Sequence, residues 1–400
     1  MASTFTPLRH RTFRYFWIVN MTSNIGTWMH IVAAAWLMTS ITSSPTLIAL
    51  LQTALTLPVF FFSIPGGMLA DIFSLKKFLC FTQAWMALAA CTLTFMTVFH
   101  LVTPWSLLGI TFLLGSGAAL NIPAMQTAIT TMVPVDDLKE ASTLNSIGFN
   151  TARVVGPALG GFLVALCGPA LVFMIDTISF LGVIFFFLWL YQQPQRRCSS
   201  GFDIKKSFSG FSKIITLHHF KNILKKTSSF FFCASIIWAL SPIIAKAQLG
   251  EGITSYTHFV TCLGLGAVLG GLSLTTLRSR LSDEKLTFSV LLLLSFLLSA
   301  LLFSKNHFMT YGILIFIGFT WISSSSTFVT AVLKTFPDHL KSRAFALYWV
   351  CFNGSVALGS AAWGKLASLS TVPTALLVCS TLAFLSALLS LKWKIEEAGD

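Results

Sequence analysis

Long apolar stretches follow one another along the whole chain, and only short polar connections separate most of them. A helix needs about 20 residues to cross the roughly 30 Å hydrocarbon core of a bilayer. Twelve stretches have this length, with approximate limits 16–38, 46–70, 78–99, 104–130, 145–166, 169–191, 228–250, 255–277, 286–304, 308–333, 344–367 and 371–391. The sequence therefore predicts an all-α integral membrane protein with twelve transmembrane helices.

The composition excludes the other broad classes of protein. Only 10% of the residues are charged and 55% are hydrophobic, whereas a soluble domain carries about 25% charged residues. A chain of 400 residues with so few charges cannot cover a globule in water. The net charge of +13 is typical of nucleic-acid binding, but the basic residues are confined to the polar connections. We therefore expect a lipid bilayer around the protein and no nucleic-acid partner.

No pattern typical of an enzyme or a metal site occurs in the sequence. The 8 cysteines form no Cys-x-x-Cys pair and lie mainly in apolar stretches, which predicts that they are buried hydrophobic residues. The Gly-x-x-x-x-Gly-Lys-Ser/Thr pattern that binds ATP phosphates is absent. We expect no enzymatic activity, no catalytic residues, no metal and no cofactor.

One connection, residues 192–227, is much longer than the others and is rich in lysine and arginine. It is predicted to be a basic cytoplasmic linker between two six-helix bundles, at residues 1–191 and 228–400. Nearly all of the 26 Lys and Arg residues lie on this linker, near the chain ends or on alternate connections. Because basic loops stay in the cytoplasm, both termini of this multi-pass protein are predicted to be cytoplasmic.

The two halves of the sequence resemble each other. Residues of the first half that recur at matching positions of the second are Pro134 with Pro337, Asn150 with Asn353, Gly156 with Gly359 and Gly161 with Gly364. Six helices restore the starting orientation, so two such halves form a parallel repeat about an axis along the membrane normal. We therefore expect two pseudo-symmetric six-helix bundles.

Several segments along the chain resemble a known family. They include Pro7-Leu-Arg-His-Arg-Thr-Phe-Arg14, Ser23-Asn-Ile-Gly-Thr-Trp-Met29, Gly66-Gly-Met-Leu-Ala-Asp71, Arg153-Val-Val-Gly-Pro-Ala-Leu-Gly-Gly161 and Ser342-Arg-Ala-Phe-Ala-Leu-Tyr348. With the six-plus-six repeat, they are similar to the major facilitator superfamily, and within it to the bacterial branch of enterobactin-exporter-like and macrolide-efflux-like proteins. The resemblance implies that fold, a bacterial inner-membrane location and alternating access to a central cavity.

The loop after the second predicted helix resembles the Gly-x-x-x-Asp-Arg-x-Gly-Arg signature of the superfamily. It runs from Gly67-Met-Leu-Ala-Asp71 to Lys76. The resemblance implies that Asp71, together with Lys76, makes a breakable contact that holds one transport state. Ile72 and Ser74 stand where the signature has Arg and Gly. Ordinary charges on a cytoplasmic loop are therefore the alternative interpretation.

The fifth predicted helix contains Gly156-Pro157-x-x-Gly160-Gly161, which resembles a motif linked with exporters. Small residues let two helix backbones approach closely, and proline removes an amide and bends the helix. Close packing of this kind can seal one side of the bundle. Simple helix packing without a sealing role is the alternative, and Gly359 and Gly364 could provide such packing in the second half.

Arg153 and Asp176 are charged residues that the sequence places deep within the fifth and sixth predicted helices. A charge at this depth costs about 3 kcal/mol on insertion scales and usually faces a cavity or a partner. The two helices are adjacent and antiparallel, which predicts an ion pair whose protonation or breakage is coupled to the change of access. A static structural pair is the alternative.

The first predicted helix is polar for its depth. Asn20, Asn24 and Thr27 recur at helical spacing, and His30 lies near the same face. A polar row on a membrane helix faces a neighbouring helix or water. The resemblance implies that the first, fourth, seventh and tenth helices line the cavity, with the candidates Asn20, Asn24, Thr27, Asn121, Gln126, Trp238, Trp321 and Ser324. Since imidazole binds a proton near neutral pH, His30 is a third coupling candidate beside Arg153 and Asp176. Bonding to neighbouring helices is the alternative for the polar residues.

Residues and resemblance together predict a secondary active transporter of a small amphiphilic molecule, such as a siderophore or a drug. Export in exchange for protons is favoured by the glycine motif and by the resemblance to the exporter branch. The absence of an ATP site indicates that the energy comes from an ion gradient or from the gradient of the substrate. An importer of a siderophore or similar molecule on the same fold is the first alternative. A non-transporting membrane receptor or assembly factor is the second. The expected partners are the small-molecule substrate, protons and the bilayer.

Overall fold

The computed structural model describes residues 5–191, 214, 217–250, 252–304, 306–336 and 338–393, and these contain helices but no β-strand. The all-α fold predicted from the sequence is therefore confirmed. The helices form two compact units, one from Met1–Thr42 and Phe61–Ser199, the other from Ser43–Phe60 and Ser200–Asp400.

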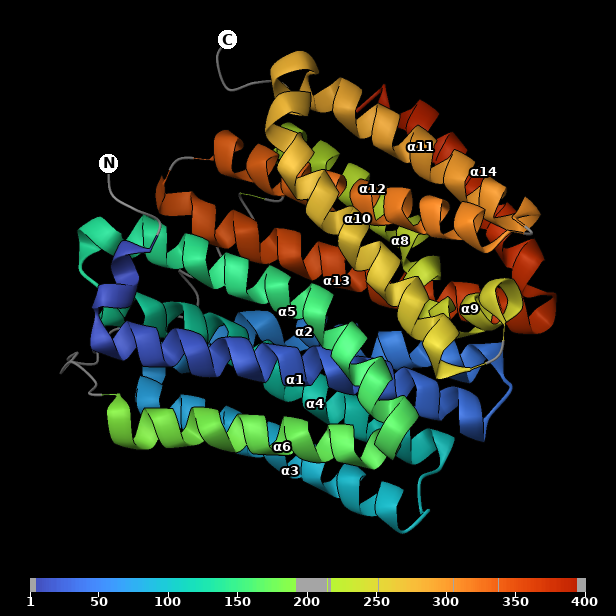
Figure 1. Ribbon diagram of the computed structural model, residues 1–400. Coiled ribbons are helices and arrows are strands. Elements are labelled where there is room, and N and C mark those ends of the chain that lie inside the picture. The colour runs from blue at the N-terminus through green and yellow to red at the C-terminus, as the bar shows by residue number, and fades with distance from the viewer. Residues whose placement is uncertain are drawn as a thin grey trace. The chain divides into compact units, whose positions relative to one another are not determined.

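The first unit is built around a long first helix (Figure 1). Its elements are η1 (Thr6–Arg9), α1 (Arg11–Ile41), the second part of α2 (Pro45–Ile72), α3 (Leu75–Val98), α4 (Pro104–Met132), η2 (Val135–Asp137), α5 (Leu138–Cys167), α6 (Pro169–Phe185) and the π-helical turn η3 (Phe186–Leu190). Helix α1 packs against α5 and α6, and α3 packs against α4 and α6. Near the start of α1, the ring of Phe16 lies 5.8 Å from that of Phe186 and 6.4 Å from that of Phe187, centre to centre.

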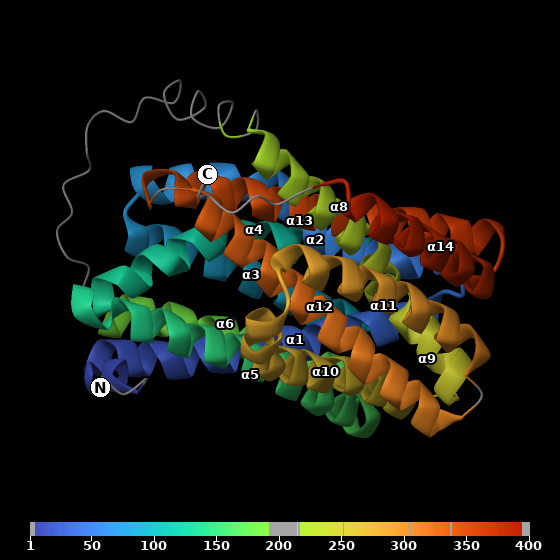
Figure 2. The same cartoon turned by 90° about the horizontal axis from the view of Figure 1, so that it is seen from above.

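The second unit contains the remaining helices, and in it α10 and α12 run side by side (Figure 2). The helices of this unit are the first part of α2, α8 (His218–Ala239), α9 (Ser241–Leu249), α10 (Ile253–Arg280), α11 (Asp283–Phe303), α12 (His307–Thr335), α13 (Asp338–Leu369) and α14 (Val372–Ser390). Ser282, Asn306 and Thr371 each accept a backbone N–H and so cap α11, α12 and α14.

Each of the twelve predicted stretches is helical, but not every stretch forms a single helix that is long and apolar enough to span a membrane. Among the described residues, ten helices are long and apolar enough to cross a membrane, and α8 with α9 makes an eleventh if the bent pair counts as one. The bend of 57° lies just before Pro242, which has no amide hydrogen to continue the helix. Helix α1 has the length but is not among them, because its polar side chains lower its mean hydropathy.

Helix α2 divides between the two units at residue 60. The sequence prediction placed all of 1–191 in one bundle, so the grouping differs from it here. The contacts explain the difference: the Thr53 hydroxyl donates to the carbonyl of Ala357 on α13 at 3.0 Å, and the Thr46 hydroxyl donates to that of Gly364 at 3.3 Å. Most of the predicted linker, 192–213, lies outside the described residues.

Candidate functional site

A histidine and a carboxylate meet inside the first unit, between α1 and α6. Nδ1 of His30 lies 2.9 Å from Oδ2 of Asp176, and the two side chains are only 5% and 1% exposed. The contact has the distance of an ion pair but not the angle of a hydrogen bond, and Nε2 of His30 also has no hydrogen-bond partner among the described residues. Both groups bind protons, so the pair is a buried place where a proton can be held.

Small and polar neighbours make room for this pair. Position 26 is a glycine, and a Cβ there would lie 3.1 Å from Oδ1 of Asp176 and 3.0 Å from the hydroxyl of Ser179. The Thr27 hydroxyl donates to Oδ1 of Asp176 at 3.4 Å. On the other side, the ring of Phe173 lies 4.6 Å from the imidazole, centre to centre. The carboxylate therefore has a hydroxyl donor, while the imidazole is packed against an apolar ring.

Arg153 does not pair with Asp176, which corrects the expectation from the sequence. Its guanidinium lies 5.8 Å from the ring centre of Trp28, within the range of a cation–π contact, whereas the side chain that lies 2.9 Å from the Asp176 carboxylate is that of His30. The reason is that α5 and α6 meet different faces of α1: α5 at Trp28, α6 at Gly26 and His30. The sequence showed that both charges were deep but not which face each helix occupies.

The glycine motif of α5 packs directly against α1. A Cβ at Gly160 would lie 2.8 Å from Cα of Met29, and one at Gly156 would lie 3.0 Å from the carbonyl oxygen of Ile25. Pro157 and Gly161 are buried within the same helix, which continues past the proline. In the second unit, Gly359 packs in the same way against Phe232 of α8. The matched residues therefore make the close packing that both interpretations of the motif expect, and the role of this packing in sealing one side stays a prediction.

The loop motif is described only in part, because the side chain of Asp71 lies outside the described residues. The Lys76 ammonium donates to the carbonyl of Leu188 at 2.9 Å and to that of Tyr191 at 3.5 Å. These carbonyls belong to the end of the helical run formed by α6 and η3. A positive charge there is favourable because free carbonyls carry partial negative charge.

Several of the predicted cavity residues bond to neighbouring helices instead. The Asn20 amide donates to Asn145 on α5 at 3.0 Å, and Asn121 accepts from Thr82 on α3 at 2.9 Å. Ser324 is buried, and its hydroxyl has no hydrogen-bond partner within the described chain. For Asn20 and Asn121, the alternative of bonding to a neighbouring helix therefore holds in this structure.

The remaining cavity candidates are partly or fully accessible. Asn24 is half-buried and Gln126 is exposed. Trp238 and Trp321 pack edge to face in the second unit, with ring centres 5.7 Å apart. Phe231 joins them at 5.1 Å from Trp321. The structure thus gathers three aromatic rings from α8 and α12 that the sequence showed only as separate residues.

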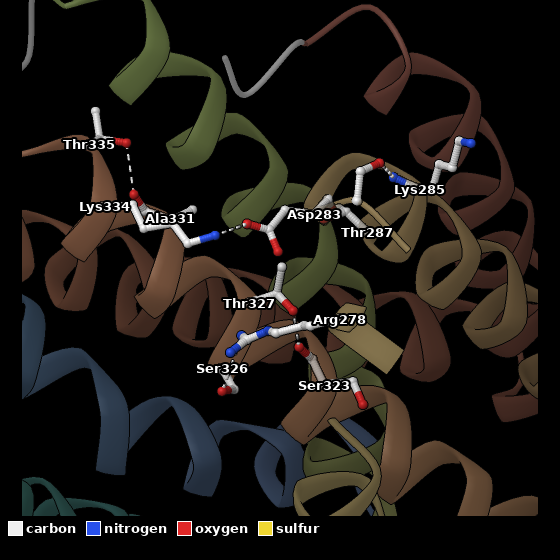
Figure 3. Close-up of polar contacts among 11 residues, drawn as sticks. Arg278, Asp283, Lys285, Thr287, Ser323, Ser326, Thr327, Ala331, Lys334 and Thr335 are labelled. Atoms are coloured by element: carbon white, nitrogen blue, oxygen red, sulfur yellow. Dashed lines mark hydrogen bonds and ion pairs between the residues drawn. The ribbon is translucent and has the colours of Figure 1, made fainter. Parts of the chain in front are cut away.

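An additional polar cluster lies at the end of the second unit where α10 and α12 finish and α11 begins (Figure 3). The Lys334 ammonium lies 3.3 Å from Oδ2 of Asp283, and Arg278 donates to the hydroxyl of Ser326 at 3.4 Å. Asp283 is in the first turn of α11, and Lys334 is in the last turn of α12, where each charge complements its helix dipole. Sequence reasoning counted these residues only as loop charges, although Ser282 before Asp283 is a capping signal.

Replacing Lys334 by alanine is expected to lower the free energy of unfolding by less than about 1 kcal/mol. The side chain is 58% exposed, so water screens the pair with Asp283. Unfolding of the purified protein by SDS titration measures the change, and Lys365→Ala, also at an exposed position, is the matched control. A loss several times larger than that of the control would show that the pair holds α11 and α12 together.

No group of three or more His, Cys, Asp or Glu residues that could hold a metal ion occurs within the described parts of the chain. The candidate site rests on the contact between His30 and Asp176 and on the hydroxyl of Thr27 beside it. The expectation that no cofactor is bound stays a prediction.

Many helices of membrane-spanning length, with polar residues buried among them, are typical of an integral membrane transporter. Over residues 2–400 the chain matches the family described as transmembrane secretion effector, and it belongs to that family. An uncharacterized MFS-type transporter of Bacillus subtilis (strain 168), YfiS, is 30% identical over 169 residues, which are 42% of this chain and 39% of that protein. The match thus spans well under half the length of that relative.

Solved transporter structures share the fold. A bacterial homologue of the human lysosomal transporter Spinster, inward-facing and unoccupied, has a TM-score of 0.73 at 12% identity and covers 98% of this chain and 100% of that one. The nucleoside transporter NupG has a TM-score of 0.75 at 13% identity, covering 96% and 98%. The POT family transporter PepTSo has a TM-score of 0.76 at 12% identity, covering 96% and 97%. The major facilitator fold expected from the resemblance is confirmed.

Proposed function

We propose that the protein exports a small amphiphilic molecule, siderophore-like or drug-like, across the bacterial inner membrane in exchange for protons. The observation that carries the proposal is the buried pair of His30 and Asp176. Two ionisable side chains buried together between the helices of a membrane protein are costly unless they have a use. Binding and release of a proton at this pair, in step with a change of access, provides such a use.

The direction and the cargo rest on separate observations. Export is supported by the description of the family as secretion effectors and by the glycine motif at Gly156, which resembles that of exporters. An amphiphilic cargo is supported by two kinds of side chain: the aromatic rings of Trp238 and Trp321 in the second unit, and half-buried polar groups such as Asn24 in the first. The branch of siderophore and macrolide exporters is part of the same proposal. So are an inner-membrane location and two cytoplasmic termini.

Transport into inverted membrane vesicles tests the proposal. We expect energised inverted vesicles that contain the protein to accumulate a radiolabelled siderophore or ethidium, and an uncoupler to abolish the accumulation. Vesicles without the protein are the control. Accumulation by intact cells but not by inverted vesicles would contradict export and favour an importer. Absence of movement in either direction would favour the receptor or assembly factor.

A further inference from the structure

A surface of lysines and one tryptophan lies in the second unit where α8 begins and α14 ends. Helix α8 packs against α14 (Figure 2), and the ammonium group of Lys225 on α8 lies 6.0 Å from the ring centre of Trp393, which follows α14. Lys221 precedes Lys225 by one helical turn, so the two share a face of α8. Lys392 precedes Trp393 in the chain, and all three lysines are exposed. We call these four residues the basic surface.

The positive charge of the basic surface is not balanced within the described chain. No ion pair joins its lysines to an acidic side chain there, and the first turn of α8 contains no acidic residue. The free N–H groups at the start of a helix add partial positive charge, so lysines at this place repel it. An anion from outside the described chain would therefore be bound favourably.

Three other lysines near this end of the unit differ, because they have acidic neighbours. Lys226 on α8 is buried, and its charge interacts with those of Glu284 and Asp283 on α11. Lys334 on α12 forms an ion pair with Asp283. Lys285 is exposed and lies in the same first turn of α11 as these two acidic residues. Unlike these three lysines, those of the basic surface lie where α8 meets the end of α14.

The end of α14 lies at the depth of lipid headgroups. The 19 residues of α14 span about 28 Å at 1.5 Å per residue, close to the thickness of the hydrocarbon core, so Lys392 and Trp393 follow in the headgroup region. Lysine and tryptophan are typical of this depth. Leu385 and Leu389 lie one turn apart on α14, and their side chains are 48% and 45% exposed. They offer an apolar contact to acyl chains along the helix just before the basic surface.

We propose that the basic surface binds the headgroup of an anionic phospholipid such as phosphatidylglycerol. The phosphate group accepts hydrogen bonds from the ammonium groups of the three lysines, and an acyl chain of the same lipid lies along the exposed leucines of α14. The ring of Trp393 is anchored at headgroup depth and positions Lys225 by the cation–π contact. This site is separate from the contact between His30 and Asp176, and it does not depend on the proposed cargo, direction or proton coupling.

Lipid binding to the full-length protein tests this assignment. Native mass spectrometry of the protein in detergent, titrated with phosphatidylglycerol or phosphatidylcholine, gives a dissociation constant for each lipid. We expect the unaltered protein to bind phosphatidylglycerol about tenfold more tightly, because the choline group neutralises the phosphate charge of the other lipid. In the double variant Lys221→Gln/Lys225→Gln, the preference is expected to disappear, since each lysine near an anionic headgroup strengthens the attraction about fivefold.

Matched variants separate this surface from a general attraction to positive charge. Arg280→Gln/Lys285→Gln removes two exposed positive charges from α10 and α11 and is expected to keep the preference for phosphatidylglycerol. Lys221→Arg/Lys225→Arg keeps the charge of the basic surface and is expected to keep the preference as well. Size-exclusion chromatography of each purified variant checks folding, and the arginine variant leaves the test informative if the glutamine variant is unstable.

Three outcomes would overturn the lipid site. The first is equal affinity of the unaltered protein for the two lipids. The second is a loss of preference in Arg280→Gln/Lys285→Gln as large as that in Lys221→Gln/Lys225→Gln. The third is displacement of phosphatidylglycerol by an equal concentration of glycerol 3-phosphate, which has the phosphate without acyl chains and would indicate a soluble phosphate compound as the ligand. We expect no such displacement.

Discussion

Asp176→Asn is expected to reduce proton-driven transport to the level of vesicles without the protein, while folded protein stays in the membrane. The amide has the size of the carboxyl group and can accept from Thr27, but it does not take up a proton. The position lies at 1% exposure beside His30, so the substitution changes a buried proton-binding group. Uptake of radiolabelled siderophore or ethidium into inverted vesicles measures the loss.

Asp283→Asn is the matched control for this variant. It makes the same chemical change at a carboxylate outside the buried site, where Asp283 pairs with the exposed Lys334, and it is expected to leave transport near its original level. Size-exclusion chromatography of both purified variants checks folding. Proton-driven transport that persists in Asp176→Asn would remove the buried pair from the mechanism.

Alanine at Gly266 or Gly318 is expected to destabilise the second unit by about 3 kcal/mol, a large effect for one methyl group. A Cβ at Gly266 on α10 would overlap the carbonyl oxygen of Ile315 on α12 and lie 2.9 Å from its Cα. A Cβ at Gly318 would overlap the carbonyl oxygen of Leu263 and lie 3.0 Å from its Cα. Backbone atoms cannot rotate away as side chains do, so the two helices have to separate. Their close approach is typical of small residues at helix contacts in membranes.

The same two helices provide controls for the glycine variants. Nothing lies within 4 Å of a Cβ at Gly271 on α10 or at Gly312 on α12, so Gly271→Ala and Gly312→Ala are expected to leave stability unchanged or slightly higher. Unfolding by SDS titration compares the four variants. Equal stability of all four would mean that α10 and α12 do not approach as closely as described.

The fold could be predicted because it depends on features that the sequence shows directly. The length of each apolar stretch sets the length of a helix that spans the bilayer, and the repeat of Asn150 and Gly156 at Asn353 and Gly359 marks the duplication. Helix α1 shows the limit of this reasoning. Its polar residues lower its mean hydropathy, yet His30 and Ser23 are buried. They are buried because they contact Asp176 and Ser179 of α6, and the mean hydropathy of a helix does not report such contacts.

The partners of the deep polar residues could not be predicted in the same way. Helical spacing placed Thr27 and His30 near one face, but it did not show whether α5 or α6 covers that face. Asp176 was therefore matched with Arg153, the deep charge of opposite sign, although the structure pairs it with His30. The contact between α10 and α12 at Gly266 was missed for the same reason, since a glycine spacing does not identify the helix that approaches it. A signal that could have found the site is a glycine such as Gly26, which lets a second helix approach closely, one turn away from a proton-binding residue such as His30.

Proton movement during transport tests the central claim most directly. Purified protein is reconstituted in liposomes that enclose a pH-sensitive dye, and a gradient of radiolabelled siderophore or ethidium is imposed without a pH gradient. We predict that the substrate moves down its gradient while protons move in the opposite direction, and that Asp176→Asn abolishes the pH change. Substrate movement at the full rate with no change of internal pH would contradict the account.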